Sequence, residues 1–242
     1  MLHSHPGPAC QRIAWGKPGP QTEQMLRALI FDLDGVIVDS HPVHKRAWKA
    51  FFASRGKTFS DEDLEFVVEG KKREDILRHF LGELTERQIK DYGAEKDALF
   101  RNSAAELSPV AGVERFLSEI SAAGLCAALA SSASRGRVGY ILQQLGLAEH
   151  FEAIVTGDDV TLGKPDPKIF QLAAAQIGIQ PHDILVCEDA VNGVQAAKSA
   201  GMKCLAIAAN GRGPVLRHAG ADKIVPDFTE ARLEELRLLF NR

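Results

Sequence analysis

The chain has 242 residues, of which 45% are hydrophobic and 25% are charged, a balance typical of a soluble globular protein with a substantial core. Its formal net charge of −3 excludes the strongly basic surface that nucleic-acid binding requires. No stretch approaches the roughly 20 apolar residues of a membrane span. We therefore expect no nucleic-acid or membrane partner, and any anion must be held by a local arrangement of residues.

The first 24 residues are rich in Pro, Gly and polar side chains and lack the apolar middle of a signal peptide. We predict that residues 1–24 form a disordered extension. Met25 stands directly before the first apolar run, so it is a candidate natural start. A chain that begins at Met25 is expected to fold and to remain active.

From residue 26 onward, short apolar runs alternate with helical patterns, which is typical of a parallel sheet covered by helices. The fold class is therefore α/β, with a doubly wound parallel sheet. The predicted strands are Ala28–Phe31, Cys126–Ala130, Ala153–Val155, Ile184–Cys187, Cys204–Ala208 and Lys223–Val225. The helices predicted between them are Val113–Ala123, Val138–Leu145, Pro167–Ile177 and Val191–Ala200.

One interval departs from this alternation. Between the first and second strands lie about 90 residues with helical periodicity, far more than a crossover usually needs. The predicted helices there are Pro42–Arg55, Asp61–Val68, Arg73–Leu81 and Thr85–Asn102. We therefore predict an inserted helical domain over residues 41–109, with the core formed by residues 25–40 and 110–242.

The four cysteines form no CxxC pair and no zinc-like spacing. Cys126, Cys187 and Cys204 lie in apolar runs, where a thiol usually behaves as a small hydrophobic group. Unpaired thiols are typical of a reducing compartment, so we expect a cytoplasmic protein. We also expect a monomer.

The strongest chemical signal follows the first strand, in the sequence FDLDGVIVDS. Asp32 and Asp34 are two positions apart, so both carboxylates can point the same way. Gly35 then allows the chain to turn as it leaves the sheet. Ligands of open parallel sheets bind beyond the carboxyl ends of strands, so this pair suits a divalent cation or acid–base chemistry.

Polar residues also follow later strands. Ser131 and Ser132 in LASS offer a hydroxyl and backbone N–H groups to an oxyanion, and Lys164 in GKPDP precedes a helix that opens with proline. Glu188 and Asp189 end another apolar strand with two carboxylates, the oxygen ligands that Mg²⁺ prefers. Each of these features is weak when taken alone.

Together, DLDGVIVDS, LASS, GKPDP and CEDAVNGVQAAKSAGM resemble the four ordered motifs of the haloacid-dehalogenase-like superfamily. The resemblance runs from about residue 26 to the end of the chain. The helical insertion between the first two motifs resembles the small α-helical cap of that superfamily. The resemblance thus implies a Rossmann-like catalytic core and phosphoryl transfer from a small phosphorylated substrate.

The resemblance also implies residue roles. Asp32 would attack phosphorus and become an aspartyl-phosphate, while Asp34 would protonate the leaving oxygen and then deprotonate the acceptor. Mg²⁺ would be held by the Asp32 carboxylate, the Asp34 backbone carbonyl and Asp189. Glu188 would influence the metal indirectly, through the groups that bind it. The phosphoryl oxygens would be anchored by the loop serines and the lysine, namely Ser131, Ser132 and Lys164.

Three stretches of the insertion, HKRAW, GKKRED and EKDALF, resemble the β-phosphoglucomutase subfamily. The resemblance implies that His44 supports the acid–base aspartate, that Arg73 grips a distal phosphate and that Lys96 serves the sugar site. Simpler interpretations exist for two of them. His44 and Trp48 are four residues apart and could pack on one helix face, and Arg73 could belong to a solvated helix start.

The sequence leaves the reaction open at two levels. Ala133 and Arg135 stand where the mutases commonly carry Ser and Asn, and Arg135 is more similar to the sugar-phosphate phosphatases. Phosphatase and mutase therefore both remain. A catalytically silent binding or regulatory protein would have lost a catalytic group, and dehalogenases or phosphonoacetaldehyde hydrolases depart from the DxD pattern that Asp34 completes.

Overall fold

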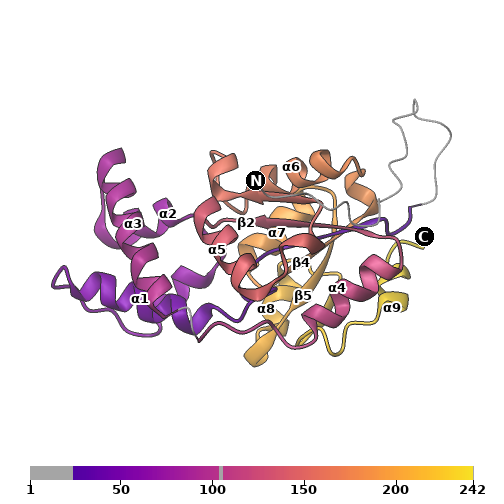
Figure 1. Cartoon of the computed structure of the whole chain (residues 1–242), viewed down its shortest axis with the longest axis horizontal. Coiled ribbons are helices and arrows are strands. Elements are labelled where there is room, and N and C mark those ends of the chain that lie inside the picture. The colour runs from indigo at the N-terminus through magenta and orange to yellow at the C-terminus, as the bar shows by residue number, and fades with distance from the viewer. Residues whose placement is uncertain (1–23, 104–105, 242) are drawn as a thin grey trace.

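The computed structural model describes residues 24–103 and 106–241, and these form a parallel sheet with helices on both faces (Figure 1). The strand order is β3-β2-β1-β4-β5-β6, so the first strand lies in the interior of the sheet. This confirms the predicted α/β class, and each predicted strand is found to within one residue at either end. The strands are β1 Ala28–Phe31, β2 Cys126–Ser131, β3 Ala153–Thr156, β4 Ile184–Glu188, β5 Lys203–Ile207 and β6 Lys223–Val225.

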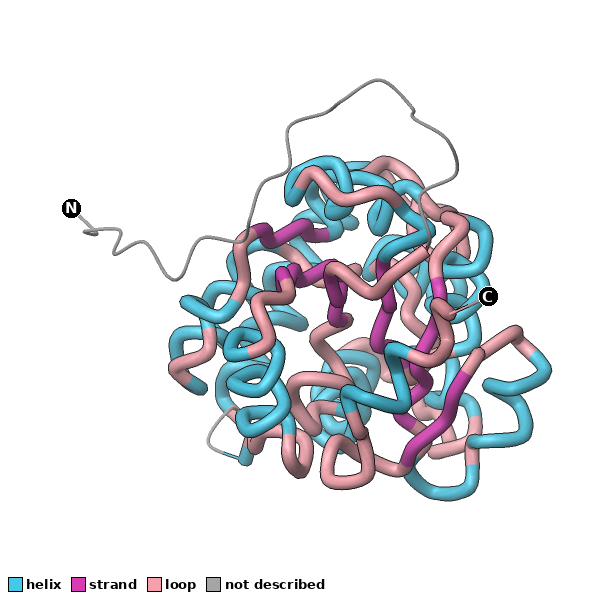
Figure 2. The backbone as a smooth tube through the Cα atoms, turned by 90° about the vertical axis from the view of Figure 1, so that its right-hand side faces the viewer, coloured by secondary structure: helices cyan, strands magenta, loops and turns pink. Residues whose placement is uncertain are grey.

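Successive side chains of a strand point to opposite faces of the sheet and belong to two separate hydrophobic cores. In β1, Leu29 and Phe31 belong to one buried cluster, whereas Ala28 and Ile30 belong to the other. Both faces are apolar because both are covered by helices, as Figure 2 shows. The first face packs against α4 Val113–Ala122, α5 Arg135–Leu145 and α9 Leu233–Arg237, and the second against α6 Lys168–Ile177, α7 Val191–Ser199 and α8 Gly213–His218.

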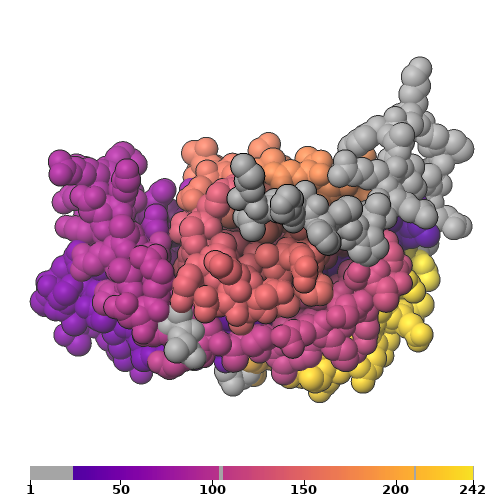
Figure 3. Space-filling model, in the orientation of Figure 1, coloured from indigo at the N-terminus to yellow at the C-terminus, as the bar shows by residue number. Residues whose placement is uncertain are grey.

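The segment between β1 and β2 is helical, and its helices pack mainly on one another at one end of the molecule (Figure 3). Trp48, Phe52 and Phe80 are the centre of a third buried cluster, which contains no strand residue. The predicted helix over residues 61–68 is a 3₁₀ helix, η1, which starts at Asp63. The remaining helices of the insertion are α1 His41–Ala53, α2 Arg73–Leu81 and α3 Glu86–Asn102.

Short 3₁₀ turns connect several core elements, namely η3 Ala148–His150, η4 Gly157–Asp159, η5 Pro181–Asp183 and η6 Ala209–Gly211. Helices α8 and α9 were not predicted, because six and five residues are too few to display a helical period.

Polar contacts of residues 69–72 join the insertion to loops of the core. Ser132 Oγ donates to the carbonyl of Gly70 at 2.8 Å, and Lys72 Nζ donates to the carbonyl of Val160 at 2.9 Å. Arg212 forms an ion pair with Glu69 at 2.5 Å. The segment at residues 69–72 therefore holds the insertion above the ends of the strands.

The cysteines follow the prediction in part. Cys187 and Cys204 are buried free thiols. Cys126 is also buried but is disulfide-bonded, so the prediction of an unpaired thiol is wrong there. The predicted disordered extension lies outside the described residues except for residue 24. Within the described residues, no helix combines the length and apolarity that crossing a bilayer requires.

Candidate active site

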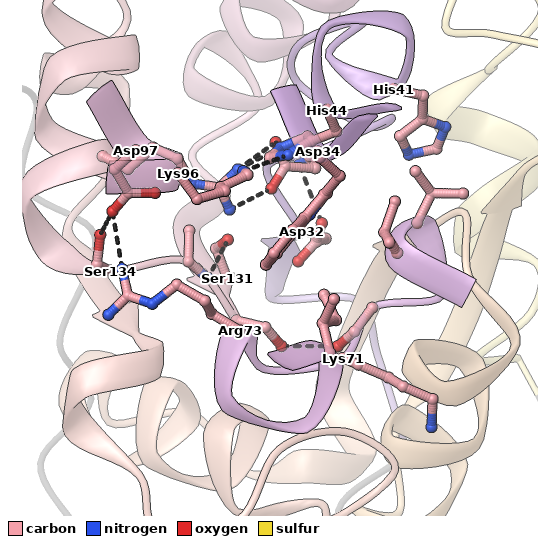
Figure 4. A pocket seen from close by; sticks show the side chains of 18 of the residues that line it. Asp32, Asp34, His41, His44, Lys71, Arg73, Lys96, Asp97, Ser131 and Ser134 are labelled. Carbon is pink, nitrogen blue, oxygen red and sulfur yellow. Dashed lines mark hydrogen bonds and ion pairs between the residues drawn. The ribbon is translucent and has the colours of Figure 1, made fainter. Parts of the chain in front are cut away.

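The candidate site lies where three neighbouring strands end. In the register of the sheet, Phe31 of β1 pairs with Leu129 of β2 and with Cys187 of β4. The residues that follow these three positions therefore emerge at one edge of the sheet, next to one another. This places Asp32 between Ser131, at the end of β2 (Figure 4), and the acidic pair Glu188 and Asp189, at the end of β4.

Lys164 links the carboxylates at the base of the site. Its Nζ lies 2.6 Å from Asp32 Oδ1 and 2.6 Å from Glu188 Oε1, and its side chain is fully buried. Although burial disfavours its charge, the two carboxylates raise the pKa of Lys164 above its ordinary value. Burial raises the pKa of Asp32 to about 7, against the opposing effect of Lys164. The ammonium therefore favours the ionised form of the predicted nucleophile.

Glu188 has little capacity left for another ligand. One of its oxygens accepts the Lys164 hydrogen bond, and the other accepts the backbone N–H groups of Asp189 at 2.8 Å and Ala190 at 3.0 Å. Its carboxylate also packs against Gly193, where an added Cβ would lie 1.8 Å from Oε1. Glu188 therefore orients Lys164 and the loop after β4.

Asp189 lies on the opposite side of the nucleophile loop. Gly35 has a φ of +76°, and a Cβ there would lie 2.2 Å from Asp189 Oδ2. Both the backbone conformation and the close contact therefore require glycine at this turn. His41 Nε2 lies 3.2 Å from the same oxygen. Burial, with further contributions from Glu188 and Asp32, raises the pKa of Asp189 well above its ordinary value.

The charge balance at this edge fits a divalent cation. Three carboxylates are buried there, those of Asp32, Glu188 and Asp189, and the Lys164 ammonium is paired with only the first two. Among the described residues, no group of three or more His, Cys, Asp or Glu side chains forms a complete metal centre. Carboxylate oxygens are ligands that Mg²⁺ prefers, and Mg²⁺ usually completes its coordination with water and substrate oxygens.

Asp34 is held by three side chains. Ser40 Oγ donates to Oδ1 at 2.6 Å, and His44 Nε2 lies 3.1 Å from the same oxygen. Arg137 Nη2 donates to Oδ2 at 2.8 Å. Burial alone would raise the pKa of Asp34, but Arg137 and His44 hold it well below its ordinary value.

The insertion brings His44 and Lys96 to this aspartate. Lys96 Nζ lies 2.8 Å from His44 Nδ1, and both side chains are buried beside the Phe100 ring. Burial and neighbouring cations lower the pKa of each group well below its ordinary value. His44 is therefore a neutral ring in contact with Asp34, and simple packing against Trp48 does not account for its position.

Arg73 opens α2 and lines the pocket at some distance from the nucleophile (Figure 4). Its Nη1 donates to Asp97 Oδ2 at 2.8 Å, and Ser134 Oγ donates to the same oxygen at 3.3 Å. The Nε of Arg73 is buried beside Gly93, where an added Cβ would lie 2.3 Å away. Arg73 therefore belongs to the pocket wall and not to a solvated helix start.

These residues line one pocket, which is partly open to solvent. Ser131 and Ser132 both line it, but Ser132 directs its hydroxyl to Gly70, and Ser131 Oγ accepts the N–H of Ala133 at 3.1 Å. The lining side chains that carry charge or a titratable ring are Asp32, Asp34, His41, His44, Lys71, Arg73, Lys96, Asp97, Arg137 and Asp189.

Sequence reasoning missed Arg137, Asp97 and His41. It considered Arg135 instead of Arg137, but Arg135 lies outside the pocket and pairs with Asp159. A helix starting at Ser134 would have placed residues 134 and 137 on one face, which was the available signal. No local pattern distinguishes Asp97 or His41 from other polar helix residues.

This chain is similar in sequence to known proteins of established families. A bacterial β-phosphoglucomutase from Bacillus subtilis is 33% identical over 221 residues, which are 87% of this chain and 94% of the relative. A phosphorylated carbohydrates phosphatase from Thermotoga maritima is 30% identical and covers 83% of this chain and 94% of its own length.

Solved structures show the same fold. The crystal structure of β-phosphoglucomutase from Clostridium difficile matches with a TM-score of 0.81 at 25% identity, covering 90% of this chain and 98% of that one. The family model of the haloacid dehalogenase-like hydrolases matches residues 26–201. The named relatives are enzymes that act on phosphorylated compounds. This chain is therefore an enzyme of the haloacid dehalogenase-like hydrolase family.

Proposed function

We propose that the enzyme transfers a phosphoryl group from a small phosphorylated metabolite, a sugar phosphate, through an aspartyl-phosphate on Asp32. The observation that carries the proposal is the position of Asp32 at the end of a central strand. There its carboxylate meets Lys164 at 2.6 Å and shares one pocket with Asp34. Nucleophile, charge neutralisation and acid–base group thus meet around one reacting phosphorus.

In the first step, an Asp32 oxygen forms a bond to phosphorus while the bond from phosphorus to the ester oxygen breaks. For this step Asp34 must carry a proton, which it gives to that leaving oxygen. In the second step, the acceptor hydroxyl gives its proton to Asp34 and attacks phosphorus, which frees Asp32. Ser131, Ser132 and Lys164 stabilise the charge on the phosphoryl oxygens, the main requirement of this reaction.

Mg²⁺ is the proposed cofactor, and it would neutralise charge on the phosphoryl oxygens when bound. The Asp32 carboxylate, the Asp34 backbone carbonyl and Asp189 would hold it. Support comes from the three buried carboxylates, of which Lys164 pairs with only two, and from the engagement of Glu188 with Lys164. Glu188 would therefore act on the site through Lys164 and not as a direct ligand.

Residues 41–109 would form a cap domain over a core made of residues 25–40 and 110–242. Arg73 and Lys96 would bind the far end of the substrate, while His44 would support Asp34. The cationic side chains on the insertion side of the pocket support a sugar phosphate with a second anionic group. Closure of the cap would exclude water and select the leaving group.

The acceptor is water in a phosphatase and a sugar-phosphate hydroxyl in a mutase. Relatives of both kinds are about equally similar to this chain. The deciding assay supplies Mg²⁺, β-glucose 1-phosphate and a bisphosphate primer, and measures glucose 6-phosphate against free phosphate. Glucose 6-phosphate without free phosphate establishes a mutase, and free phosphate from many esters establishes a phosphatase.

Asp32→Asn is expected to abolish turnover without changing the fold, because the amide cannot act as the nucleophile. Product formation and far-ultraviolet circular dichroism check the two parts. Substantial remaining activity would refute the role of Asp32. A silent binding protein would instead show no turnover in the wild type and no Mg²⁺-dependent capture of BeF₃⁻ at Asp32.

We further propose that the enzyme is a cytoplasmic monomer. Size-exclusion chromatography with light scattering tests the oligomeric state, and a dimer mass would overturn it.

A further inference from the structure

Arg137 occupies an unusual place in the pocket. It comes from α5 of the core, and its side chain is only 11% exposed. Its Nη2 donates to Asp34 Oδ2 at 2.8 Å, its Nη1 contacts His44 Nε2, and its guanidinium lies 5.4 Å from the centre of the Phe100 ring. The guanidinium thus lies against the carboxylate that the proposed mechanism uses for proton transfer.

Both carboxylate oxygens of Asp34 already have hydrogen-bond partners, which a leaving group would have to displace or share. Ser40 and His44 cover Oδ1, and Arg137 covers Oδ2. Ser40 is completely buried and His44 nearly so, and both start from the same short stretch of chain as Asp34. Arg137 reaches Asp34 from a distant helix through a long side chain that lines the pocket, so its contact is the one that a substrate can exchange.

The other pocket cations are held differently. Arg73 pairs with Asp97, and Lys96 contacts His44, so a substrate anion that draws either of them leaves Asp34 covered. Among the described side chains of the pocket, Arg137 is the arginine that forms an ion pair with Asp34. An anion that takes over this guanidinium both gains a bidentate partner and exposes Asp34 Oδ2.

We propose that Arg137 is a specificity-determining residue that covers Asp34 until an anionic group on the leaving group takes its guanidinium. The inference rests on the proposed function, in which Asp34 serves the leaving oxygen. A phosphate or carboxylate on the departing molecule would satisfy Arg137. The enzyme therefore favours esters whose leaving group carries a second negative charge over esters with an uncharged leaving group.

The test compares β-glucose 1,6-bisphosphate with β-glucose 1-phosphate in single-turnover experiments with excess enzyme and Mg²⁺. The measured quantity is the rate at which the dephosphorylated sugar is released, so phosphatase and mutase respond alike. The variants are Arg137→Ala and Arg137→Lys. The matched control is Arg135→Ala, two positions away, which removes an arginine from outside the pocket.

In the wild type, we expect faster release from the bisphosphate. Arg137→Ala should slow that reaction by about 10- to 100-fold, the usual effect of losing a hydrogen bond to a charged group. It should slow release from the monophosphate by less, so that the ratio of the two rates falls. Arg137→Lys should restore part of the preference, and Arg135→Ala should behave as wild type. An equal loss with both esters, or an unchanged ratio, would overturn the inference.

A binding measurement separates this inference from the proposed function. In Asp32→Asn protein, calorimetry with β-glucose 1,6-bisphosphate should show weaker binding when Arg137→Ala is added and no change when Arg135→Ala is added. Equal bisphosphate binding with and without Arg137→Ala would overturn the inference even if the wild type turns over normally. Absence of wild-type turnover combined with Arg137-dependent binding would refute the catalytic proposal and leave anion recognition by Arg137 standing.

Discussion

The core and the insertion contribute to the same pocket by different physical means. The core supplies Asp32, Ser131 and Asp189 from strand ends whose relative positions are set by the backbone register of β2, β1 and β4. The insertion supplies Arg73 and Lys96 from helices, where positions depend on side-chain packing and ion pairs. Groups that need fixed geometry thus come from the sheet, and groups that meet a variable substrate come from the helices.

The two regions also differ in charge. The core side of the pocket holds most of the carboxylates together with Arg137. The insertion side holds most of the cations, namely Arg73, Lys96 and Lys71, together with Asp97. A metal ion suits the first region and an anionic substrate suits the second. Substitutions can test whether chemistry and recognition are separated in this way.

The largest effect is expected from Lys164→Met in the core. The variant leaves the carboxylates of Asp32 and Glu188 buried without their ammonium, which should cost roughly 3–5 kcal/mol of unfolding free energy. The rate of phosphoryl transfer should fall by about 10²–10³, as when a stabilising donor is removed. Denaturant unfolding and steady-state kinetics measure the two effects. Exposed Lys168→Met is the control, and an equal loss there would contradict the assignment.

A smaller effect is expected from Gly93→Ala in the insertion, which should weaken substrate binding and stabilise the fold. The new methyl group would lie 2.3 Å from Arg73 Nε and must displace that side chain, so KM should rise about tenfold for a doubly anionic substrate. Replacing glycine inside α3 should meanwhile raise the unfolding free energy by up to about 1 kcal/mol. Gly139→Ala in α5 meets nothing within 4 Å and is the matched control. A KM that rises equally in both variants would argue against a role for Gly93.

The smallest effect concerns pH. Burial, Lys96 and Arg137 hold the pKa of His44 well below its ordinary value of 6.5. Below about pH 6.5 the unfolded chain therefore binds a proton that the native state does not, and the stability present above that pH is lost as the pH falls.

The wild type should lose about 1.4 kcal/mol more than His44→Gln between about pH 7.5 and pH 5.5. Urea unfolding at the two pH values measures this difference, and exposed His218→Gln should behave as the wild type. Identical pH dependence in wild type and His44→Gln would show that the ring is protonated in the native state.

The parts of the molecule that the sequence predicts well are those with local signals. Continuous apolar runs identified the strands, and polar residues immediately after them identified Asp32, Glu188 and Asp189. Arg137 escaped prediction because its partner, Asp34, is 103 residues away and is met only after the chain folds. Asp97 escaped prediction for the same reason, because its partner in the site, Arg73, comes from another helix. Contacts between distant charges have no periodicity, so a single sequence does not reveal them.

Trp48 is an intrinsic fluorescent probe of the pocket. Its indole is 1% exposed, lines the pocket and lies 5.3 Å from the ammonium of Lys96. The other tryptophan of the chain, Trp15, lies outside the described residues. Indole emission responds to nearby charge, so an anion that enters next to Lys96 should change the fluorescence of Trp48. Substrate arrival at the insertion side can thus be followed in real time without an attached dye, separately from the chemistry at the sheet.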